Sequence, residues 1–176
     1  MRFRIRQAGA ADADQIVAIL IATKEASLPE LTAAHDRDVP FWTRRWRDYL
    51  TEGSRAQQSR GDGVAYVAES AGRAVGFVAY HHTTRHGADA ELESIYVLPG
   101  AQRHGIGSAL LRVVARRLVK EGSRSLCVGY DAKNPFKRFY AKHGATELNA
   151  RWAIWRDLGD VARGKGGPRR PTALRD

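Results

Sequence analysis

The sequence predicts an α/β fold built on a mixed sheet, because it combines a hairpin pattern with a β-α-β pattern. Two strand-like runs, 64–69 and 74–82, are joined by the turn Ser-Ala-Gly-Arg at 70–73, which is typical of an antiparallel hairpin. Residues 90–130 then read as a strand, an amphipathic helix and a second strand. A connection of this kind makes its two strands parallel, with a right-handed crossover. A sheet that contains both pairings is mixed.

The N-terminal elements come before this hairpin. Arginine alternates with apolar residues at 2–6, which predicts a strand with one buried face. Asp12, followed three residues later by a glutamine, matches a capping box, and helical spacing of apolar residues continues to about Ala22. Residues 23–39 have no clean period, so a loop or a short helix is expected there. An aromatic and aliphatic stripe predicts a helix at 41–50.

The C-terminal elements complete the order β-α-α-β-β-β-α-β-α-β. A strand at 90–98 leads into a helix at 105–121, and an apolar strand follows at 125–130. Asn134 followed by proline is a typical helix start, and a last strand is predicted at 152–157. Ligands of open sheets bind beyond the carboxyl ends of the strands. A site is therefore expected where the two parallel strands end.

Length and charge favour one domain followed by a basic tail. The 176 residues suit a single domain at 1–158, whereas 159–176 is rich in glycine, proline and basic residues and is expected to be disordered. A net charge of +10 favours an acidic partner such as a phosphorylated cofactor, but no aromatic stacking pattern points to nucleic acid. No apolar run has the length of a membrane span, and no signal-peptide pattern is present. With the single cysteine Cys127, these features predict a cytoplasmic protein.

A glycine-containing loop precedes the helix at 105–121. The chain reads Gln-Arg-His-Gly-Ile-Gly-Ser at 102–108. Two glycines at a helix N-terminus leave backbone N–H groups bare, and the helix dipole adds roughly half a positive charge there. Arg103 and His104 add side-chain donors. The pattern lacks the lysine of a P-loop and the third glycine of the dinucleotide fingerprint, so it predicts a pyrophosphate site of another kind.

Two linked motifs resemble the signature of the GCN5-related N-acetyltransferase (GNAT) family. The run 91–111 resembles the family's strand, its Gln/Arg-x-x-Gly-x-Gly/Ala loop and its helix, with Gln102, Gly105 and Gly107 in order. A second block, 134–144, has the family's asparagine, Phe-Tyr pair and glycine. Both motifs stand at the separation that the family shows.

The resemblance implies a mostly antiparallel sheet with helices on both faces, in which a central parallel strand pair splays apart around acetyl-CoA. It implies acetyl transfer to a primary amine, of a small molecule more than of a protein, by direct attack in a ternary complex. It implies no metal, and the fold class also allows a homodimer. The cofactor contacts that it implies are Tyr96 and Val97 at the pantetheine arm, Gln102, Arg103, His104, Gly105, Ile106, Gly107 and Ser108 at the pyrophosphate, and Asn134 on the other side of the arm.

Acetyl transfer needs a base for the ammonium, donors for the carbonyl oxygen and an acid for the leaving thiolate. Tyr140 occupies the family position of the acid. Glu91 lies six residues before Val97, where some members carry a catalytic glutamate. Glu93 lies nearer the sulfur, on the same side of the strand if alternation is undisturbed. Desolvation on this apolar strand is expected to raise the pKa of such a glutamate.

Other readings of these residues stay open. His81 or His82, at the end of the preceding strand, offers a proton relay through water instead of a direct base. Cys127 lies within an apolar strand, where a thiol is usually an inert core residue, so an acetyl-enzyme is not expected. A non-catalytic acyl-CoA sensor and a protein N-terminal or lysine acetyltransferase are the alternative functions.

The family resemblance places the acceptor pocket beneath residues 23–50. Substrate contacts are expected from Trp42, Trp46, His81 and Tyr130. The acids Glu30, Asp36 and Asp38 lie in the same segment and are expected to attract a cationic amine.

Overall fold

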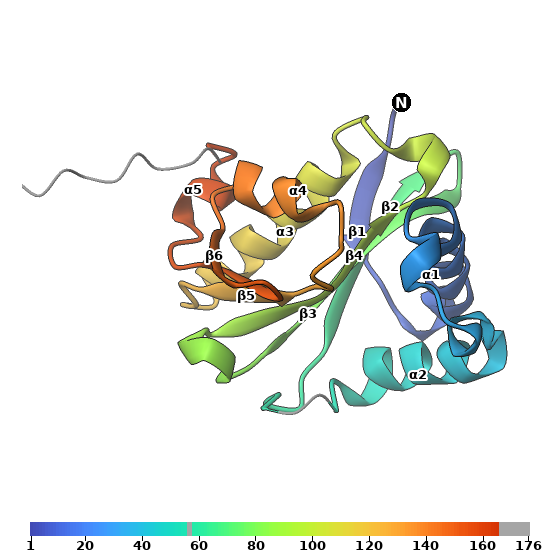
Figure 1. Ribbon diagram of the computed structural model, residues 1–176, viewed down its shortest axis with the longest axis horizontal. Coiled ribbons are helices and arrows are strands. Elements are labelled where there is room, and N and C mark those ends of the chain that lie inside the picture. The colour runs from blue at the N-terminus through green and yellow to red at the C-terminus, as the bar shows by residue number, and fades with distance from the viewer. Residues whose placement is uncertain (56–57, 166–176) are drawn as a thin grey trace, which may run out of the picture.

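The computed structural model describes residues 1–55 and 58–165, which form one seven-stranded sheet with helices on both faces (Figure 1). The strands are β1 (Arg4–Gln7), β2 (Val64–Ser70), β3 (Arg73–His82), β4 (Ala90–Val97), β5 (Leu126–Gly129), β6 (Thr146–Asn149) and β7 (Trp152–Trp155). The α-helices are α1 (Ala13–Ser27), α2 (Val39–Glu52), α3 (Ile106–Lys120), α4 (Lys137–Lys142) and α5 (Gly159–Ala162). None of these helices has the length and apolar character needed to cross a membrane.

The sheet is mixed, and its one parallel pair is short. The strand order is β1-β2-β3-β4-β5-β7-β6, with every neighbouring pair antiparallel except β4 and β5. The parallel pairing joins only Ala90–Leu92 to Leu126–Val128. Residues 93–97 of β4 have no partner in β5, so the two strands separate toward their carboxyl ends. The predicted mixed, mostly antiparallel sheet with a splayed central pair is confirmed.

Each face of the sheet carries its own apolar core. On one face, α3 buries Leu110 and Val114 together with Val161 of α5. On the other face, α1 and α2 bury Ile16 and Trp46 in a second cluster. The four-residue spacing from Leu110 to Val114 is the apolar stripe that the sequence predicts for this helix. The two cores hold the sheet between two helical layers, and the splayed end of β4 lies between them.

A β-bulge in β4 reverses the alternation of its side chains. Leu92 and Ser94 pair with successive residues of β3, which leaves Glu93 as the extra residue. Leu92 and Ile95 therefore both face the α3 core, although they are three positions apart. Glu91 and Glu93 precede this reversal and keep the same face, on the side of α1 and α2. The expectation that Glu91 and Glu93 share one face of the strand is therefore correct, but side chains after Glu93 no longer follow the same alternation.

The helix α4 and the strand β6 differ from the sequence expectation. The Asn134 side chain accepts a hydrogen bond from the Phe136 N–H at 2.8 Å, in a turn two residues long, and α4 begins only at Lys137. Asn134 is therefore not the N-cap of this helix. The sequence analysis also missed β6, because its mostly exposed residues give no clear alternation.

The expected tail does not begin at residue 159. The short helix α5 buries Val161, and Leu158 just before it is fully buried. The Arg116 side chain of α3 donates to the Ala162 carbonyl at 2.9 Å. Two buried apolar residues three positions apart, together with this hydrogen bond, hold the turn on α3. The rest of the predicted disordered tail, 166–176, lies outside the described residues.

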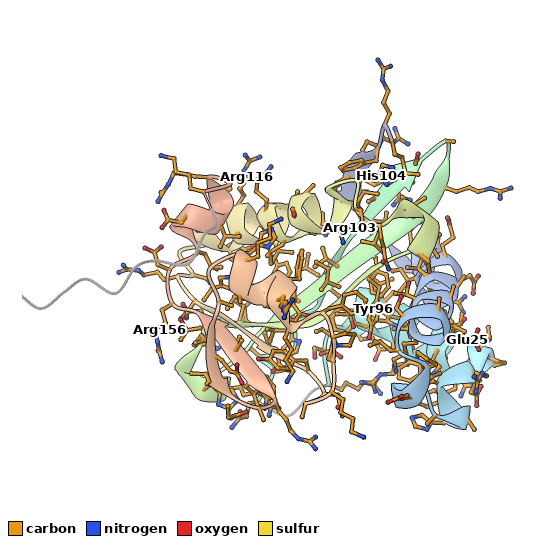
Figure 2. All side chains as sticks on the ribbon, turned by 45° about the horizontal axis from the view of Figure 1, so that its top comes forward. Glu25, Tyr96, Arg103, His104, Arg116 and Arg156 are labelled. Carbon is orange, nitrogen blue, oxygen red and sulfur yellow. The ribbon has the colours of Figure 1, made fainter. Side chains whose placement is uncertain are left out.

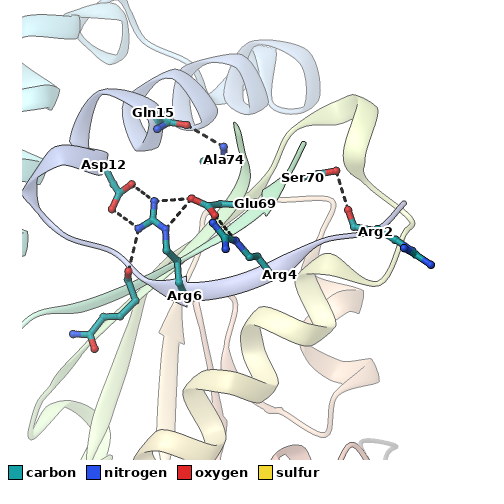
Figure 3. Close-up of polar contacts among 9 residues, drawn as sticks. Arg2, Arg4, Arg6, Asp12, Gln15, Glu69, Ser70 and Ala74 are labelled. Atoms are coloured by element: carbon teal, nitrogen blue, oxygen red, sulfur yellow. Dashed lines mark hydrogen bonds and ion pairs between the residues drawn. The ribbon is translucent and has the colours of Figure 1, made fainter. Parts of the chain in front are cut away.

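An ion-pair network joins β1, β2 and the start of α1 (Figure 3). The Arg6 guanidinium contacts both carboxylate oxygens of Asp12, at 2.6 and 2.8 Å, and lies 2.7 Å from a Glu69 oxygen. The Gln15 side chain accepts from the Ala74 N–H at 3.0 Å. The expected capping box of Asp12 and Gln15 is therefore wrong, because both side chains bond to partners outside α1.

Replacing Asp12 by asparagine is expected to lower the free energy of unfolding by about 2 kcal/mol at pH 7. The hydrogen bonds from Arg6, assisted by the Gly9 N–H, outweigh burial and hold the pKa of Asp12 below its ordinary value. A carboxyl with a lowered folded pKa stabilises the fold above its unfolded pKa of about 4, and loses that contribution as the pH falls further. Urea unfolding at pH 7 and at pH 3 measures both effects.

The matched control is Asp14→Asn, since Asp14 is an exposed aspartate in the first turn of α1. It is expected to leave the unfolding midpoint unchanged. A loss of stability for the Asp12 variant that is the same at pH 3 as at pH 7 would contradict the ionic explanation.

Candidate active site

A cleft of about 1100 Å³ opens where β4 and β5 separate. It is lined by the splayed half of β4, the loop before α3, the first turn of α3, the end of β5 and α4. Nine of the residues predicted to contact the cofactor line this cleft: Tyr96, Val97, Gln102, Arg103, Gly105, Ile106, Gly107, Ser108 and Asn134. The structure thus brings residues from three separate segments of the chain into one cavity.

The first turn of α3 offers free backbone donors to this cleft. Gly105 precedes the helix in the left-handed conformation, at φ +80°. The Ala109 N–H bonds to the Gly105 carbonyl at 3.0 Å, and within the described ranges the N–H groups of 106–108 have no acceptor. Such groups at a helix N-terminus bind anions. Figure 2 shows Arg103 and His104 together at this end of α3, although the exposed His104 does not line the cleft.

Side-chain hydrogen bonds fix the walls around these donors. The Gln102 amide and the Thr23 hydroxyl both donate to the Val97 carbonyl, at 3.1 and 3.3 Å. These two donors occupy both lone pairs of the Val97 carbonyl oxygen. Of the two backbone polar groups of Val97, the N–H is therefore the one that remains for a ligand. The Ser108 hydroxyl lies 2.9 Å from Nε2 of His143, which ties the first turn of α3 to the end of α4.

Tyr140 is buried in an aromatic stack on the wall of the cleft. Its ring lies parallel to Tyr130, with centroids 5.6 Å apart, and meets Trp155 edge-on at 5.9 Å. Desolvation, followed by the neighbouring Tyr96 and Tyr130, raises the pKa of Tyr140 above that of an ordinary phenol. The phenol therefore remains protonated at neutral pH, which is the form that a proton donor requires.

Glu91 is held in an ion-pair cluster and does not line the cleft. One of its oxygens accepts from the Arg85 guanidinium at 2.9 Å and lies 3.7 Å from the His81 ring. Burial favours the neutral acid, but the His81 ring and the Arg85 charge outweigh it, so the pKa of Glu91 is lowered. The expected rise in pKa is therefore wrong for Glu91.

Glu93 is the carboxylate that reaches open space. It lines the cleft and also a second cavity of about 210 Å³, which we call the acceptor cavity after the role proposed for it below. Its side chain is 24% exposed, against 12% for Glu91. The bulge explains this position, because it makes Glu93 the one residue of β4 without a β3 partner at the point where β5 has also ended its pairing.

His81 lies between the two glutamates and is wholly buried. Its two ring nitrogens lie 3.7 Å from Glu91 and 3.5 Å from Glu93. The three side chains offer ligand atoms within 4.8 Å of one another. Because each nitrogen faces a different carboxylate and Arg85 already balances Glu91, the arrangement suits an ion-pair cluster better than a single metal centre. His81 lines neither cavity. The ring of the partly exposed His82 contacts the Asp62 carboxylate through its Nδ1.

The acceptor cavity lies between α2 and Glu93. It is lined by Phe41, Arg44, Arg45, Trp46, Asp48, Tyr49, Gly53, Ser54, Arg55 and Glu93. Of the predicted substrate contacts, Trp46 lines this cavity and Tyr130 lines the cleft. Trp42 lines neither, because its indole N–H donates to the His35 carbonyl at 3.0 Å. Sequence reasoning missed the arginines, since it followed only the apolar stripe of α2.

The acids expected to attract a cationic amine have structural partners instead. Asp36 is buried and bonds to Lys24 at 2.7 Å. Asp38 accepts from the Phe41 N–H at 2.9 Å and caps α2. Glu30 lines the cleft and not the acceptor cavity. Asp36 and Asp38 line neither cavity, so the structure does not place them where an acceptor amine is proposed to bind.

Cys127 is fully buried, and desolvation raises the pKa of its thiol to about 12. A thiol in this state is a poor nucleophile at neutral pH. This agrees with the prediction that Cys127 is a core residue.

Comparisons with known proteins identify the family of this chain. The model of the acetyltransferase (GNAT) family matches residues 28–145. A probable N-acetyltransferase of Mycobacterium tuberculosis is 26% identical over an alignment 155 residues long, which covers 80% of this chain and 86% of that protein. An uncharacterized N-acetyltransferase of the same organism is 30% identical over 138 residues, covering 76% of this chain and 82% of that protein.

Solved structures share the fold. The paiA N-acetyltransferase of Thermoplasma acidophilum, in complex with coenzyme A, superposes with a TM-score of 0.70 at 19% identity and covers 89% of this chain and 99% of its own. A GNAT acetyltransferase of Brucella melitensis, in complex with acetyl-CoA, gives a TM-score of 0.59 at 21% identity, with 88% of each chain covered. Since the family model spans most of the sequence and its motifs line one cleft, this chain belongs to the GNAT family of acetyltransferases.

Proposed function

We propose that this protein transfers the acetyl group of acetyl-CoA to the primary amine of a small molecule, by direct attack in a ternary complex. The observation that carries the proposal is the splayed β4–β5 pair. It opens one cleft that is lined by the free N-terminus of α3, by Glu93 and by Tyr140. The groups suited to bind an anion and the groups suited to transfer protons thus line the same cavity.

The cleft fits an elongated, phosphorylated ligand. The free N–H groups of 106–108 and the Arg103 side chain suit a pyrophosphate, and Arg138 and Lys142 add positive charge to the lining. Its volume of about 1100 Å³ lies above the usual range for small-molecule pockets. The structural neighbours solved with coenzyme A and with acetyl-CoA support the same ligand here. Bound acetyl-CoA supplies the activated acetyl thioester.

Two side chains then divide the proton transfers. Glu93 receives the proton that the acceptor ammonium must lose before it attacks, because it is the carboxylate shared by the cleft and the acceptor cavity. Tyr140 delivers a proton from its hydroxyl to the leaving sulfur. Backbone N–H groups in the splayed part of β4, such as that of Val97, are donors for the carbonyl oxygen. A covalent acetyl-enzyme would need a nucleophile, and Cys127 of β5 is unsuited to that role because burial raises the pKa of its thiol.

The size of the acceptor cavity supports a small acceptor. Its volume of about 210 Å³ is below the roughly 300–1,000 Å³ of most ligand pockets. A side chain of a folded protein has to enter together with its flanking backbone, whereas a free amine of a few heavy atoms enters alone.

The test is thiol release from acetyl-CoA with a panel of amines, run beside a thermal shift with acetyl-CoA alone. We expect release above the hydrolytic background with at least one small-amine class, and inhibition by added coenzyme A. Acetyl-CoA at about 100 times its Kd is expected to stabilise the fold by about 2.7 kcal/mol. Stabilisation without turnover on any amine would instead indicate an acyl-CoA sensor, and turnover only on peptides would indicate a protein acetyltransferase.

A further inference from the structure

We propose that the acceptor amine carries a carboxylate, which Arg44 and Arg45 bind while Glu93 faces the ammonium. The substrate class is then a small zwitterion of the amino-acid type. This inference rests on the proposed function and adds the acceptor chemistry to it. Its basis is the distribution of charge around the acceptor cavity.

The arginines are placed on the cavity by the spacing of α2. Phe41, Arg44, Arg45 and Asp48 follow one another at i, i+3, i+4 and i+7, so they form a single stripe of the helix. All four line the acceptor cavity. Arg47, on the same helix, does not line it. The positive charge is therefore directed at this cavity by helical position and is not a general property of α2.

These two guanidiniums remain available for an anion. Arg55, the third arginine of the lining, pairs with Glu52. In the described part of the chain, neither Arg44 nor Arg45 makes an ion pair, and the Arg45 guanidinium lies over the Trp42 ring at 5.8 Å. Asp48 is the one acid that α2 contributes to the lining, so it balances one of the two charges and leaves one positive charge in excess.

The rest of the lining offers little else to recognise a polar group. The Tyr49 hydroxyl donates to the Tyr80 carbonyl at 2.6 Å, so it is already bonded. Phe41 provides an apolar wall, and Trp46 adds a buried indole N–H that has no acceptor among the described residues and is therefore a single neutral donor. Recognition of a negative charge therefore falls to Arg44 and Arg45, whose planar donors bind a carboxylate through two parallel hydrogen bonds.

Glu93 and the two arginines of the acceptor cavity that remain available come from different secondary-structure elements. Glu93 is on β4 and also lines the cleft, whereas Arg44 and Arg45 are on α2 and line only the acceptor cavity. An amine held by Glu93 would thus sit next to the cleft, and an anionic group on the same molecule would extend toward α2. A polyamine of the same size would place a second cation beside two guanidiniums, which like-charge repulsion disfavours.

The experiment compares matched pairs of acceptors in the thiol-release assay. Each pair consists of an amino acid and its decarboxylated amine, such as phenylalanine with phenethylamine, tyrosine with tyramine and lysine with cadaverine. Phosphoethanolamine and ethanolamine form a further pair that separates a phosphate from a carboxylate. We expect kcat/KM to be about 10- to 100-fold higher for the carboxylate member of at least one pair.

Variants assign the effect to the two arginines. Arg44→Gln and Arg45→Gln are expected to raise KM for the preferred amino acid about 10-fold or more, with little change in kcat and none in acetyl-CoA affinity. They are expected to impair the decarboxylated partner far less than the amino acid, because that partner has no carboxylate to lose, and to relieve the repulsion of a diamine such as cadaverine. Arg47→Gln is the matched control, because it removes the same charge from the same helix outside the cavity, and it is expected to leave both substrates unaffected.

The outcomes separate this inference from the proposed function. Turnover that favours the decarboxylated amines, or arginine variants that affect both members of a pair equally, would overturn the inference while the acetyltransferase function stands. A preference for phosphoethanolamine over every amino acid would overturn the carboxylate assignment. Absence of turnover on every amine, with intact acetyl-CoA binding, would refute the proposed function itself and with it this inference.

Discussion

Replacing Tyr140 by phenylalanine is expected to lower kcat by about 100-fold or more, with acetyl-CoA affinity unchanged. The substitution removes one hydroxyl and keeps the ring, so the stack with Tyr130 and Trp155 is retained. The thiolate must then leave without a proton donor. Steady-state kinetics with the best acceptor, together with acetyl-CoA titration by calorimetry, measures both quantities.

The pH profile adds a second readout for the same residue. Since burial raises the pKa of Tyr140 above its ordinary value of about 10, the phenol holds its proton throughout the neutral and mildly alkaline range. Wild-type kcat is therefore expected to show no alkaline loss below about pH 10 from this group. Tyr66→Phe, on β2, is the control and is expected to keep full activity. An unchanged kcat for the Tyr140 variant would show that it is not the acid.

Replacing Glu93 by glutamine is expected to lower kcat/KM for the amine by about 100-fold at pH 7. The reason is that most of a primary amine is protonated at this pH, and the variant lacks the carboxylate that receives the proton. The defect is expected to shrink as the pH rises toward the pKa of the free amine, because about tenfold more neutral amine is present per pH unit. The pH dependence of kcat/KM for both enzymes measures this.

Glu91→Gln is the informative comparison, since Glu91 neighbours the same histidine but lines neither cavity. It breaks the bond to Arg85, so a loss of thermal stability is expected, without the pH-dependent rescue of the Glu93 variant. If the rescue by high pH were seen for Glu91→Gln and not for Glu93→Gln, the roles of the two glutamates would be exchanged.

Much of the cofactor side of the site was predictable because it is local in the sequence. The strand, the Gly105 turn and the first turn of α3 follow one another without interruption, so their spacing specifies the anion-binding groups directly. The fold class was predictable for the same reason, since a hairpin and a β-α-β unit are read from neighbouring segments. Tyr140 followed from the second linked motif.

The side proposed for the acceptor was predictable only in part: Trp46 and Glu93 were expected there, but the rest depends on packing between distant segments. The bulge at Glu93 arises from the β3–β4 register, and no local residue pattern announces it. The partners of Asp36 and Asp38 come from α1 and α2, so their charges look free in the sequence and are engaged in the fold. The role proposed for Arg44 and Arg45 could be inferred only from the fold, in which these residues of α2 and Glu93 of β4 line the same cavity.

The most direct test of the account is the fate of a radiolabelled acetyl group supplied as acetyl-CoA. We predict that the label appears on the nitrogen of the free acceptor, that it does so only when enzyme and acceptor are both present, and that the protein itself remains unlabelled. Label retained on the protein in the absence of acceptor would contradict direct attack and point to an acetyl-enzyme. Label that stays on coenzyme A with every amine would contradict the acetyltransferase assignment of this site.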